Sequence, residues 1–178
     1  MTIELAWVDR ELRSLDRLAG ELVVASMFAE ERPPRGIAGL LDWRLGGRLS
    51  RLCAEGYVEG SDGETLLVPG RPRVGFEKIV VIGLGARAAF DDAAFERTLS
   101  RTLGVLAGLQ ARKVTIELPG RHAGAIDADR ALTILVTLLG LSGGEPLATE
   151  LEAITLVDDA DAHRAYSAAR GRLVRARR

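Results

Sequence analysis

The sequence predicts an α/β fold in which helices cover both faces of a mixed, largely parallel sheet. Short apolar strands and amphipathic helices alternate through the second half of the chain, and these helices are long enough to serve as crossover connections. With 178 residues, 47% of them hydrophobic and 28% charged, the chain suits one globular domain. We therefore expect residues 1–178 to form a single domain, with residues 158–178 as a terminal helix that carries a basic tail.

Two strands are expected at the start of the chain. Alternating apolar and polar residues predict a half-buried strand over residues 2–8. The run ELVVASMF predicts a more buried strand over residues 21–28. The order of elements is not a uniform series of strand–helix–strand units, so we expect the antiparallel neighbours in the first half of the chain.

One helix is expected from Ile37 to Leu52, because apolar residues recur there at steps of three and four. Gly46 and Gly47 lie inside it and each costs about 1 kcal/mol relative to alanine, so we expect another backbone to approach at that point. On the same helix, Asp42 and Trp43 are candidate functional residues, but an acid of the N-terminal turn and a partly buried anchor suffice to explain them. Cys53 is interpreted as a small core residue.

The rest of the chain alternates between strands and helices. Ser61-Asp62-Gly63 has the composition of a turn, and Asp91 is a good N-cap for the helix that follows. The expected elements are a strand over 78–82, a helix from Asp91 onward, a strand over 113–118, a helix over about 127–141, a strand over 153–157 and a helix over about 160–175.

Composition and charge exclude several classes of protein. The formal net charge of −1 excludes a globally basic nucleic-acid binder, and we expect no nucleic-acid partner. Cys53 is the single cysteine, so no internal disulfide can form. No apolar run approaches the ~18 residues of a membrane span, and the N-terminal residues do not resemble a signal peptide. We expect a cytoplasmic protein that does not enter the membrane.

Charge is segregated at the end of the chain. Residues 145–163 hold six acids and no lysine or arginine, whereas residues 164–178 hold six arginines and no acid. One interpretation is complementarity with the dipole of the last helix, with acids at its start and arginines at its end. The alternative is a tail that docks on an acidic partner or on a nucleic-acid backbone.

The segment from Gly83 to Ala88 fits the pattern G-x-G-x-x-A directly after a buried strand. In such a loop, backbone amides approach a phosphate beside a helix N-terminus. Gly83, Gly85, Ala86 and Arg87 are therefore our candidate anion- or nucleotide-binding residues. The alternative is a tight strand-to-helix turn, since Asp91 and the acid after it occupy the positive end of the next helix.

Gly140-Leu141-Ser142-Gly143-Gly144 fits G-x-S-x-G, and Asp158 and His163 follow in the chain order of a hydrolase triad. A nucleophile elbow needs a strand before the serine, whereas a helix is expected there. We therefore interpret the glycines as a helix stop and keep a hydrolase only as a lesser alternative.

The sequence offers no pattern typical of a metal site. His122 and His163 are far apart in sequence, and there is no pair of cysteines. We interpret His122, near Asp127 and Asp129, as a loop residue at the surface, and we expect neither a metal nor another cofactor.

Residues from about Gly36 to Leu118 resemble the N-terminal domain of the leucyl aminopeptidase (cytosol aminopeptidase) family. The matching segments are LLDWRLGGRLS over 40–50, YVEGSDGET over 57–65 and VVIGLG over 80–85, together with the helix and strand that follow. The resemblance implies a three-layer α/β/α sandwich similar to macro domains, with a role in assembly. The family's two-metal site and its NTDAEGR-like segment belong to a separate C-terminal domain, and no such segment occurs in this sequence. The resemblance therefore carries no catalytic residue onto any position here.

Three functions follow from these observations. The first is a non-catalytic module that forms homo-oligomers or docks on another protein. The second is a macro-like binder of ADP-ribose or another nucleotide near Gly83–Arg87. The third is a hydrolase that uses Ser142 or a bound metal.

Overall fold

A computed structural model describes residues 3–141 and 147–175 of the chain, with side chains up to residue 167. The strands in this part of the chain are β1 (Glu4–Asp9), β2 (Gly20–Met27), β3 (Thr65–Pro69), β4 (Phe76–Gly83), β5 (Lys113–Ile116) and β6 (Ala153–Asp158). The α-helices are α1 (Leu12–Arg17), α2 (Gly36–Arg44), α3 (Arg48–Ala54), α4 (Asp92–Gly108), α5 (Ala128–Leu138) and α6 (Ala160–Arg175). Two short 3₁₀ helices, η1 (Arg87–Ala89) and η2 (Arg121–Ala123), lie in loops.

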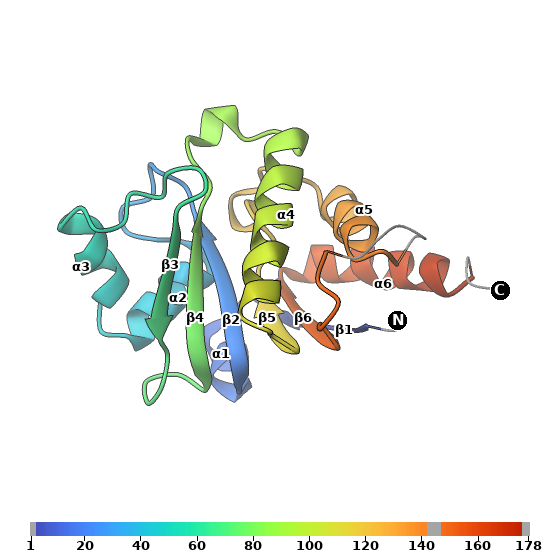
Figure 1. Cartoon of the computed structure of the whole chain (residues 1–178), viewed down its shortest axis with the longest axis horizontal. Coiled ribbons are helices and arrows are strands. Elements are labelled where there is room, and N and C mark those ends of the chain that lie inside the picture. Colours follow the sequence, from blue (N-terminus) through green and yellow to red (C-terminus); the bar gives the residue numbers. More distant parts are fainter. Residues whose placement is uncertain (1–2, 142–146, 176–178) are drawn as a thin grey trace.

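The strands form one sheet in the order β1-β6-β5-β2-β4-β3. Neighbouring strands run parallel except β3 and β4, which pair antiparallel with Leu66 opposite Val81. The predicted mixed and largely parallel sheet is confirmed, and its antiparallel pair lies in the first half of the chain. The parallel strands end at one edge of the sheet, which is uppermost in Figure 1, where β4 leads through η1 to the start of α4.

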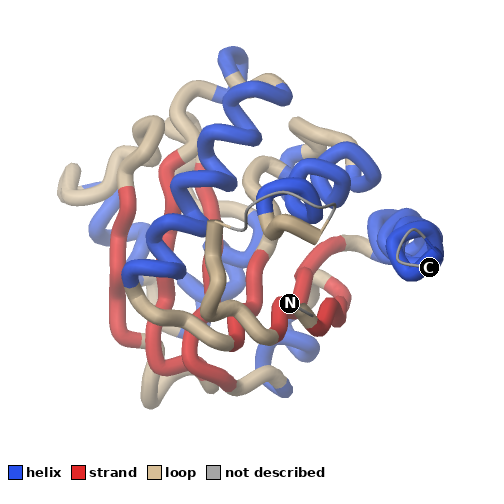
Figure 2. The backbone as a smooth tube through the Cα atoms, turned by 45° about the vertical axis from the view of Figure 1, so that its right-hand side comes forward, coloured by secondary structure: helices blue, strands red, loops and turns tan. Residues whose placement is uncertain are grey.

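Helices cover both faces of this sheet, as the sequence predicts. Buried residues of α1, α2 and α3 form one cluster with one face of the strands, and those of α4, α5 and α6 form a second cluster with the other face. In β2, Val23 belongs to the first cluster and Val24 to the second, which is the alternation expected of a strand buried on both sides. Figure 2 shows the strands side by side with the long helix α4 crossing in front of them.

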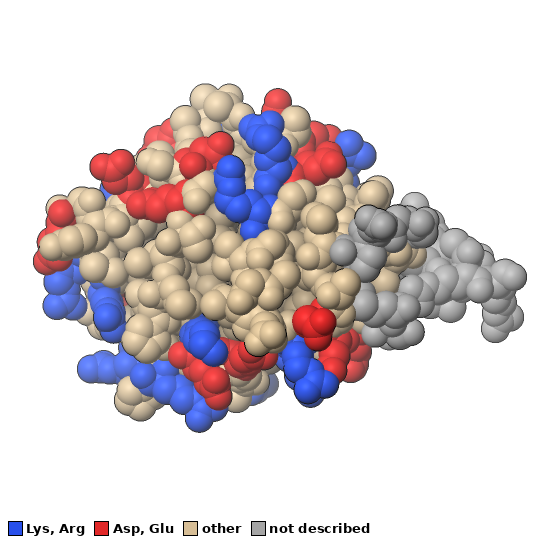
Figure 3. Space-filling view, viewed as in Figure 1, with Lys and Arg blue, Asp and Glu red and all other residues tan. Residues whose placement is uncertain are grey.

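The surface in the view of Figure 3 has charged borders and an uncharged middle. Large apolar side chains are exposed at Trp43 (73%), Tyr57 (72%) and Leu67 (51%). Trp43 was expected to be a partly buried anchor, and that expectation is wrong. The interior is nevertheless filled by two clusters of buried apolar side chains, one on each face of the sheet.

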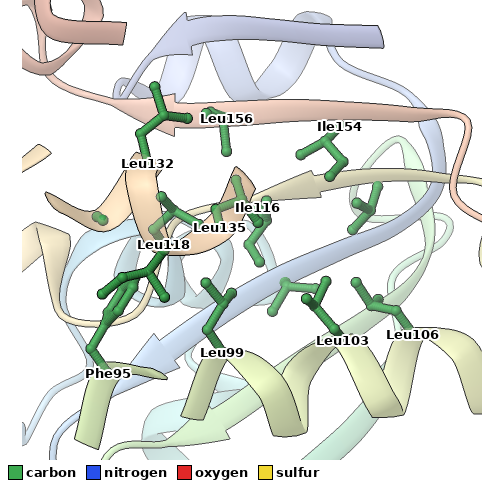
Figure 4. Close-up of a cluster of buried hydrophobic side chains, with 14 of the residues drawn as sticks. Phe95, Leu99, Leu103, Leu106, Ile116, Leu118, Leu132, Leu135, Ile154 and Leu156 are labelled. Carbon is green, nitrogen blue, oxygen red and sulfur yellow. The ribbon is translucent and has the colours of Figure 1, made fainter. Parts of the chain in front are cut away.

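The larger core lies between the sheet and α4, α5 and α6. Phe95, Leu99 and Leu103 repeat at steps of four along α4, and all are almost fully buried. Figure 4 shows these side chains pointing from α4 toward Ile116 of β5 and Ile154 of β6. Asp91 caps the helix as predicted, because its Oδ1 accepts a hydrogen bond from the Ala94 N–H at 2.8 Å.

The single helix predicted from Ile37 to Leu52 is wrong, because the structure has two helices there. Gly46 and Gly47 separate α2 from α3, and both have left-handed backbone angles (φ +67° and +77°). A Cβ at Gly47 would meet nothing within 4 Å, so a closely approaching backbone is not the reason for the glycine. The positive φ is the reason, since other residues are strained there.

The carboxylate of Asp42 bridges the break between these two helices. It accepts hydrogen bonds from the Leu49 N–H at 2.7 Å, the Ser50 N–H at 3.1 Å and the Ser50 hydroxyl. Asp42 therefore lies in α2 and caps the N-terminus of α3. Because a single helix was expected over α2 and α3, this cap could not be predicted from the sequence. Cys53 of α3 is buried, as predicted.

Helix α1, between β1 and β2, was not predicted. It has six residues, of which Leu15 is buried, and its N-cap Glu11 makes no side-chain capping bond. So short a helix leaves almost no periodic signal in the sequence. Helix α1 connects β1 to β2, which are not neighbours in the sheet, because β1 pairs with β6.

Alanine substitutions at two glycines are expected to change stability in opposite directions. Gly47→Ala places a Cβ at φ +77° and should lower the free energy of unfolding by about 1 kcal/mol. Gly104→Ala lies inside α4 in open space and should raise it by up to ~1 kcal/mol. Urea unfolding of the two variants beside the wild type checks both signs, and equal effects would contradict the assignment of the helix break.

Candidate functional site

The carboxyl edge of the parallel strands is the candidate site. In open α/β sheets, ligands bind outside the carboxyl ends of the strands. Here the segments after β1, β2, β4, β5 and β6 meet at this edge, and polar side chains from these segments contact one another across it.

The predicted loop Gly83–Arg87 leaves β4 at this edge, and the N–H groups of Gly83, Leu84, Gly85 and Arg87 are engaged within the protein. The Gly83 N–H donates to the Glu64 carbonyl at 2.8 Å, and the Gly85 N–H donates to the Gly60 carbonyl at 2.8 Å. The Arg87 N–H donates to both carboxylate oxygens of Glu30, at 3.1 and 3.2 Å. A carboxylate of the chain thus stands where the motif predicts a bound anion.

The glycines of this loop have a packing reason of their own. A Cβ on Gly83 would lie 2.1 Å from the Ser61 carbonyl oxygen, and Gly85 has φ +73°. The tight turn that we weighed as the alternative therefore accounts for both glycines. Ala86 precedes η1, and the Arg87 guanidinium donates to the Ala123 carbonyl in the loop after β5. Anion binding by these residues stays a prediction.

A buried glutamate, Glu117, lies directly after β5 and holds a second helix. Its Oε2 accepts a hydrogen bond from the Ile37 N–H, in the first turn of α2, at 3.0 Å. Its Oε1 lies 3.3 Å from Arg10 Nε, an ion-pair contact without hydrogen-bond alignment. The N-terminus of α2, a place where helices bind anions, is therefore occupied by the protein's own carboxylate.

His122 lies between two carboxylates at this edge. Its Nε2 is 2.6 Å from Glu31 Oε1, and its Nδ1 is 3.7 Å from Glu117 Oε2. Glu31 also accepts from the Phe28 N–H after β2, and the Phe28 ring lies 5.8 Å from the imidazole. His122 was expected at the surface as a loop residue, and that expectation is wrong, because its side chain is almost fully buried.

A second buried acid, Asp158, ends β6 and organises the far side of the edge. Its carboxylate accepts from Arg121 Nε at 2.7 Å and from the Tyr166 hydroxyl at 2.9 Å. Arg10 reaches it as well, at 3.4 Å, and so bridges Asp158 and Glu117. Burial, with the neighbouring Asp158 charge, raises the pKa of Tyr166, so that its hydroxyl stays protonated and donates.

Burial raises the pKa of Glu117 to about 7. Loss of hydration is the largest cause, and the charge of Asp158 acts in the same direction. His122, the Ile37 N–H and Arg10 oppose the shift, because each stabilises the ionised carboxylate. Glu117 thus changes its protonation near neutral pH inside the folded protein.

The G-x-S-x-G segment has the geometry of a helix end. Gly140 has φ +67°, its N–H donates to the Thr137 carbonyl, and the Leu141 N–H donates to the Val136 carbonyl. These two bonds form the Schellman motif that ends α5, as expected for a glycine stop. Ser142, Gly143 and Gly144 lie outside the described residues.

The other two members of the predicted triad are engaged elsewhere. Asp158 binds Arg121 and Tyr166, whereas the His163 ring packs edge-on against Trp7 with ring centroids 5.1 Å apart. Among residues 3–141 and 147–175, no cluster of three or more His, Cys, Asp and Glu side chains could hold a metal ion. No helix in the same ranges has both the length and the apolar character needed to cross a membrane.

The comparisons with known proteins agree with this fold. Residues 23–143 match the model of the cytosol aminopeptidase family, N-terminal domain. The chain belongs to this family. A "Probable cytosol aminopeptidase" of Ralstonia nicotianae is 32% identical over 123 residues, which is 69% of this chain and 24% of that protein. One of Thermosynechococcus vestitus is 32% identical over 117 residues, 66% of this chain and 23% of that protein. The matched residues therefore span about a quarter of the length of these relatives.

Solved structures show the same fold at low sequence identity. A variant of tomato leucine aminopeptidase superposes with a TM-score of 0.62 and 16% identity over 97% of this chain and 36% of its own. A macrodomain of Oceanobacillus iheyensis gives a TM-score of 0.67 and 14% identity over 90% of this chain and 89% of its own. A Trypanosoma brucei macrodomain in complex with ADP-ribose gives a TM-score of 0.65 and 16% identity, over 93% of this chain and 68% of its own. The family resemblance and the macro-like α/β sandwich inferred from the sequence are confirmed.

The substitution Glu117→Gln is expected to remove a pH dependence of stability. Between about pH 4.5 and 7 the folded protein keeps a proton on Glu117 that the unfolded chain has lost, so the wild type loses stability as pH rises through this window. One pKa unit corresponds to about 1.4 kcal/mol. Across this window the free energy of unfolding of the wild type should therefore fall by about 3 kcal/mol relative to that of Glu117→Gln. Urea unfolding of both proteins from pH 5 to pH 8 measures it, and a pH-independent difference would disprove the assignment.

Proposed function

We propose that this chain acts as a non-catalytic assembly module, which associates with copies of itself or docks on another protein. One observation carries the proposal: carboxylates of the chain itself occupy the edge of the sheet where ligands bind in open α/β folds. Glu30 holds the Arg87 N–H, Glu117 holds the N-terminus of α2, and Asp158 holds Arg121. These contacts connect the loops to one another at this edge and fill the place where a ligand would bind.

The outer surface supports the same proposal. Trp43 exposes 73% of its surface, and a large exposed apolar side chain is a feature of surfaces that contact other proteins. The cytosol aminopeptidase relatives are about three times as long as this chain, and we propose none of their catalytic residues for it. We propose a cytoplasmic location, as for the relatives whose name includes the cytosol.

Assembly is tested by size-exclusion chromatography with light scattering over a series of protein concentrations. The expected outcome is a mass that exceeds the 19.1 kDa of one chain and rises with concentration, or a defined partner retained by the immobilised protein. A single-chain mass at every concentration, together with no defined partner, would refute the proposal.

A second candidate is binding of ADP-ribose or another nucleotide near Gly83–Arg87. The observation in its favour is that the T. brucei macrodomain, which shares this fold, was solved with ADP-ribose. In this chain, Glu30 is exposed and could leave Arg87, whereas Glu117 is fully buried. A nucleotide phosphate would therefore replace Glu30 at the Arg87 N–H and would leave the Glu117 network in place.

The substitution Glu30→Ala separates the two candidates. If Glu30 blocks this loop, the wild type shows no thermal shift with ADP-ribose, and Glu30→Ala gains one, because the Arg87 N–H becomes free. Ligand at 100 times its dissociation constant adds about 2.7 kcal/mol to the free energy of unfolding. Glu96→Ala, an exposed acid on α4, is the matched control. A clear shift in the wild type would favour nucleotide binding as the function.

A further inference from the structure

Trp43 protrudes beside a shallow groove on α2. The groove has a volume of about 530 Å³, and its other lining residues are Pro33, Pro34, Gly39, Asp42, Gly46 and Gly47. The Asp42 carboxylate is already used to cap α3, so the groove offers mainly apolar surface. An indole that is 73% exposed, where the sequence suggests a partly buried anchor, has no packing role within the chain.

Exposed arginines lie beside this groove. Arg35 follows Pro34, Arg48 follows Gly47, and Arg73 approaches Gly46 to 4.0 Å from the position of a Cβ there. Arg48 and Arg51 line an adjoining hollow, together with the acid Glu55. These four arginines are exposed, and in the part of the chain that the structure describes none forms an ion pair or a side-chain hydrogen bond. Figure 3 shows basic side chains gathered at this end of the molecule, on the lower left.

A cleft of complementary character lies between α5 and α6. It has a volume of about 490 Å³, with Ala128, Ala162 and Ala165 among its lining residues. Four aspartates also line it, namely Asp127, Asp129, Asp159 and Asp161, together with two arginines. Most of these charges have partners within the chain: Arg121 pairs with Asp158 and Asp159, Arg130 with Asp92, Asp159 also with Arg10, and Asp161 with Arg164. The Asp127 side chain is exposed and makes no hydrogen bond or ion pair among the described residues.

We propose that Trp43 of one copy of this chain inserts into the cleft between α5 and α6 of a second copy. The alanines would receive the indole, and the exposed Asp127, which has no side-chain partner among the described residues, would face the arginines beside the groove. Tryptophan and arginine are the residue types enriched where interfaces hold most of their binding energy. This inference rests on the proposed assembly function and deepens it by naming the partner and both surfaces.

The positions of the two surfaces determine the form of the assembly. The groove lies on α2 and at the break before α3, whereas the cleft is formed by the first turns of α5 and α6, so the two surfaces differ from each other (Figure 1). Such a head-to-tail contact uses one surface of each copy and leaves the other free, so it builds rings or growing chains rather than a two-fold dimer. A strand of nucleic acid would need successive stacking faces, whereas this groove offers one indole.

Analytical ultracentrifugation of the full chain tests the contact. Association should weaken as salt rises from about 0.1 M to about 1 M, because the Debye length falls from about 10 Å to about 3 Å. Trp43→Ala should weaken the association constant by about 30-fold or more, as expected for the central residue of an interface. Tyr57→Ala is the matched control, because Tyr57 is 72% exposed but lines neither the groove nor the cleft, and it should leave association unchanged.

Disabling each surface separately gives the decisive result. Trp43→Ala with Arg48→Ala disables the groove, and Asp127→Lys with Asp161→Lys disables the cleft, so that the two altered surfaces do not complement each other. Each double variant alone should stop growing into larger assemblies. An equimolar mixture should form a dimer limited to one copy of each kind, because the intact cleft of the first variant accepts the intact groove of the second. Arg97→Glu on α4, outside both surfaces, should behave as the wild type.

Thermal unfolding of each variant confirms that it is folded before its association is interpreted. Assembly that is equally strong in Trp43→Ala and Tyr57→Ala would overturn this contact and leave the proposed assembly function standing. If the mixture of the two double variants forms no larger assembly than either variant alone, this contact is likewise overturned and the proposed assembly function still stands. A wild type that stays monomeric would also overturn the contact, and the assembly function would then depend on the capture of a different protein.

Discussion

The fold depends on the polar partners of Glu117, whose carboxylate is buried at the carboxyl edge of the sheet. Arg10 after β1, the Ile37 N–H at the start of α2 and His122 after β5 all face it, and Arg10 connects it to Asp158 at the end of β6. Removing one partner of a buried ion pair leaves an uncompensated charge and typically costs about 3–5 kcal/mol. Glu117 and Arg10 together therefore link segments from both ends of the chain at this edge.

Most of the fold could be predicted because its strands and longer helices carry strong periodic signals. The run ELVVASMF and the apolar steps along α4 each correspond to an element of the structure with nearly the predicted bounds. The predictions failed where the signal is short or depends on backbone angles. Helix α1 has six residues, and the break at Gly46 and Gly47 follows from positive φ, which apolar spacing does not report.

The site was harder to predict than the fold, because its residues meet only in three dimensions. The G-x-G pattern located the loop after β4, but nothing nearby in sequence indicates that Glu30, 57 residues away, accepts from the Arg87 N–H. One signal was available: Glu117 lies near the end of the strand predicted over 113–118, Asp158 follows the strand predicted over 153–157, and parallel strands bring such residues to one edge. His122 gave no comparable signal, since its burial depends on Glu31 and Glu117 from two other segments.

A fold shared with ligand-binding macrodomains does not determine what this edge does, because amide donors can hold either a phosphate or a carboxylate. The two internal carboxylates differ in how easily a ligand could replace them. Glu117 is fully enclosed, and its displacement would leave Arg10 and the first turn of α2 without their partner. Glu30 is exposed and holds one backbone N–H. Any ligand of this edge would therefore have to enter beside the loop after β4, while the Glu117–Asp158 side remains part of the structural framework.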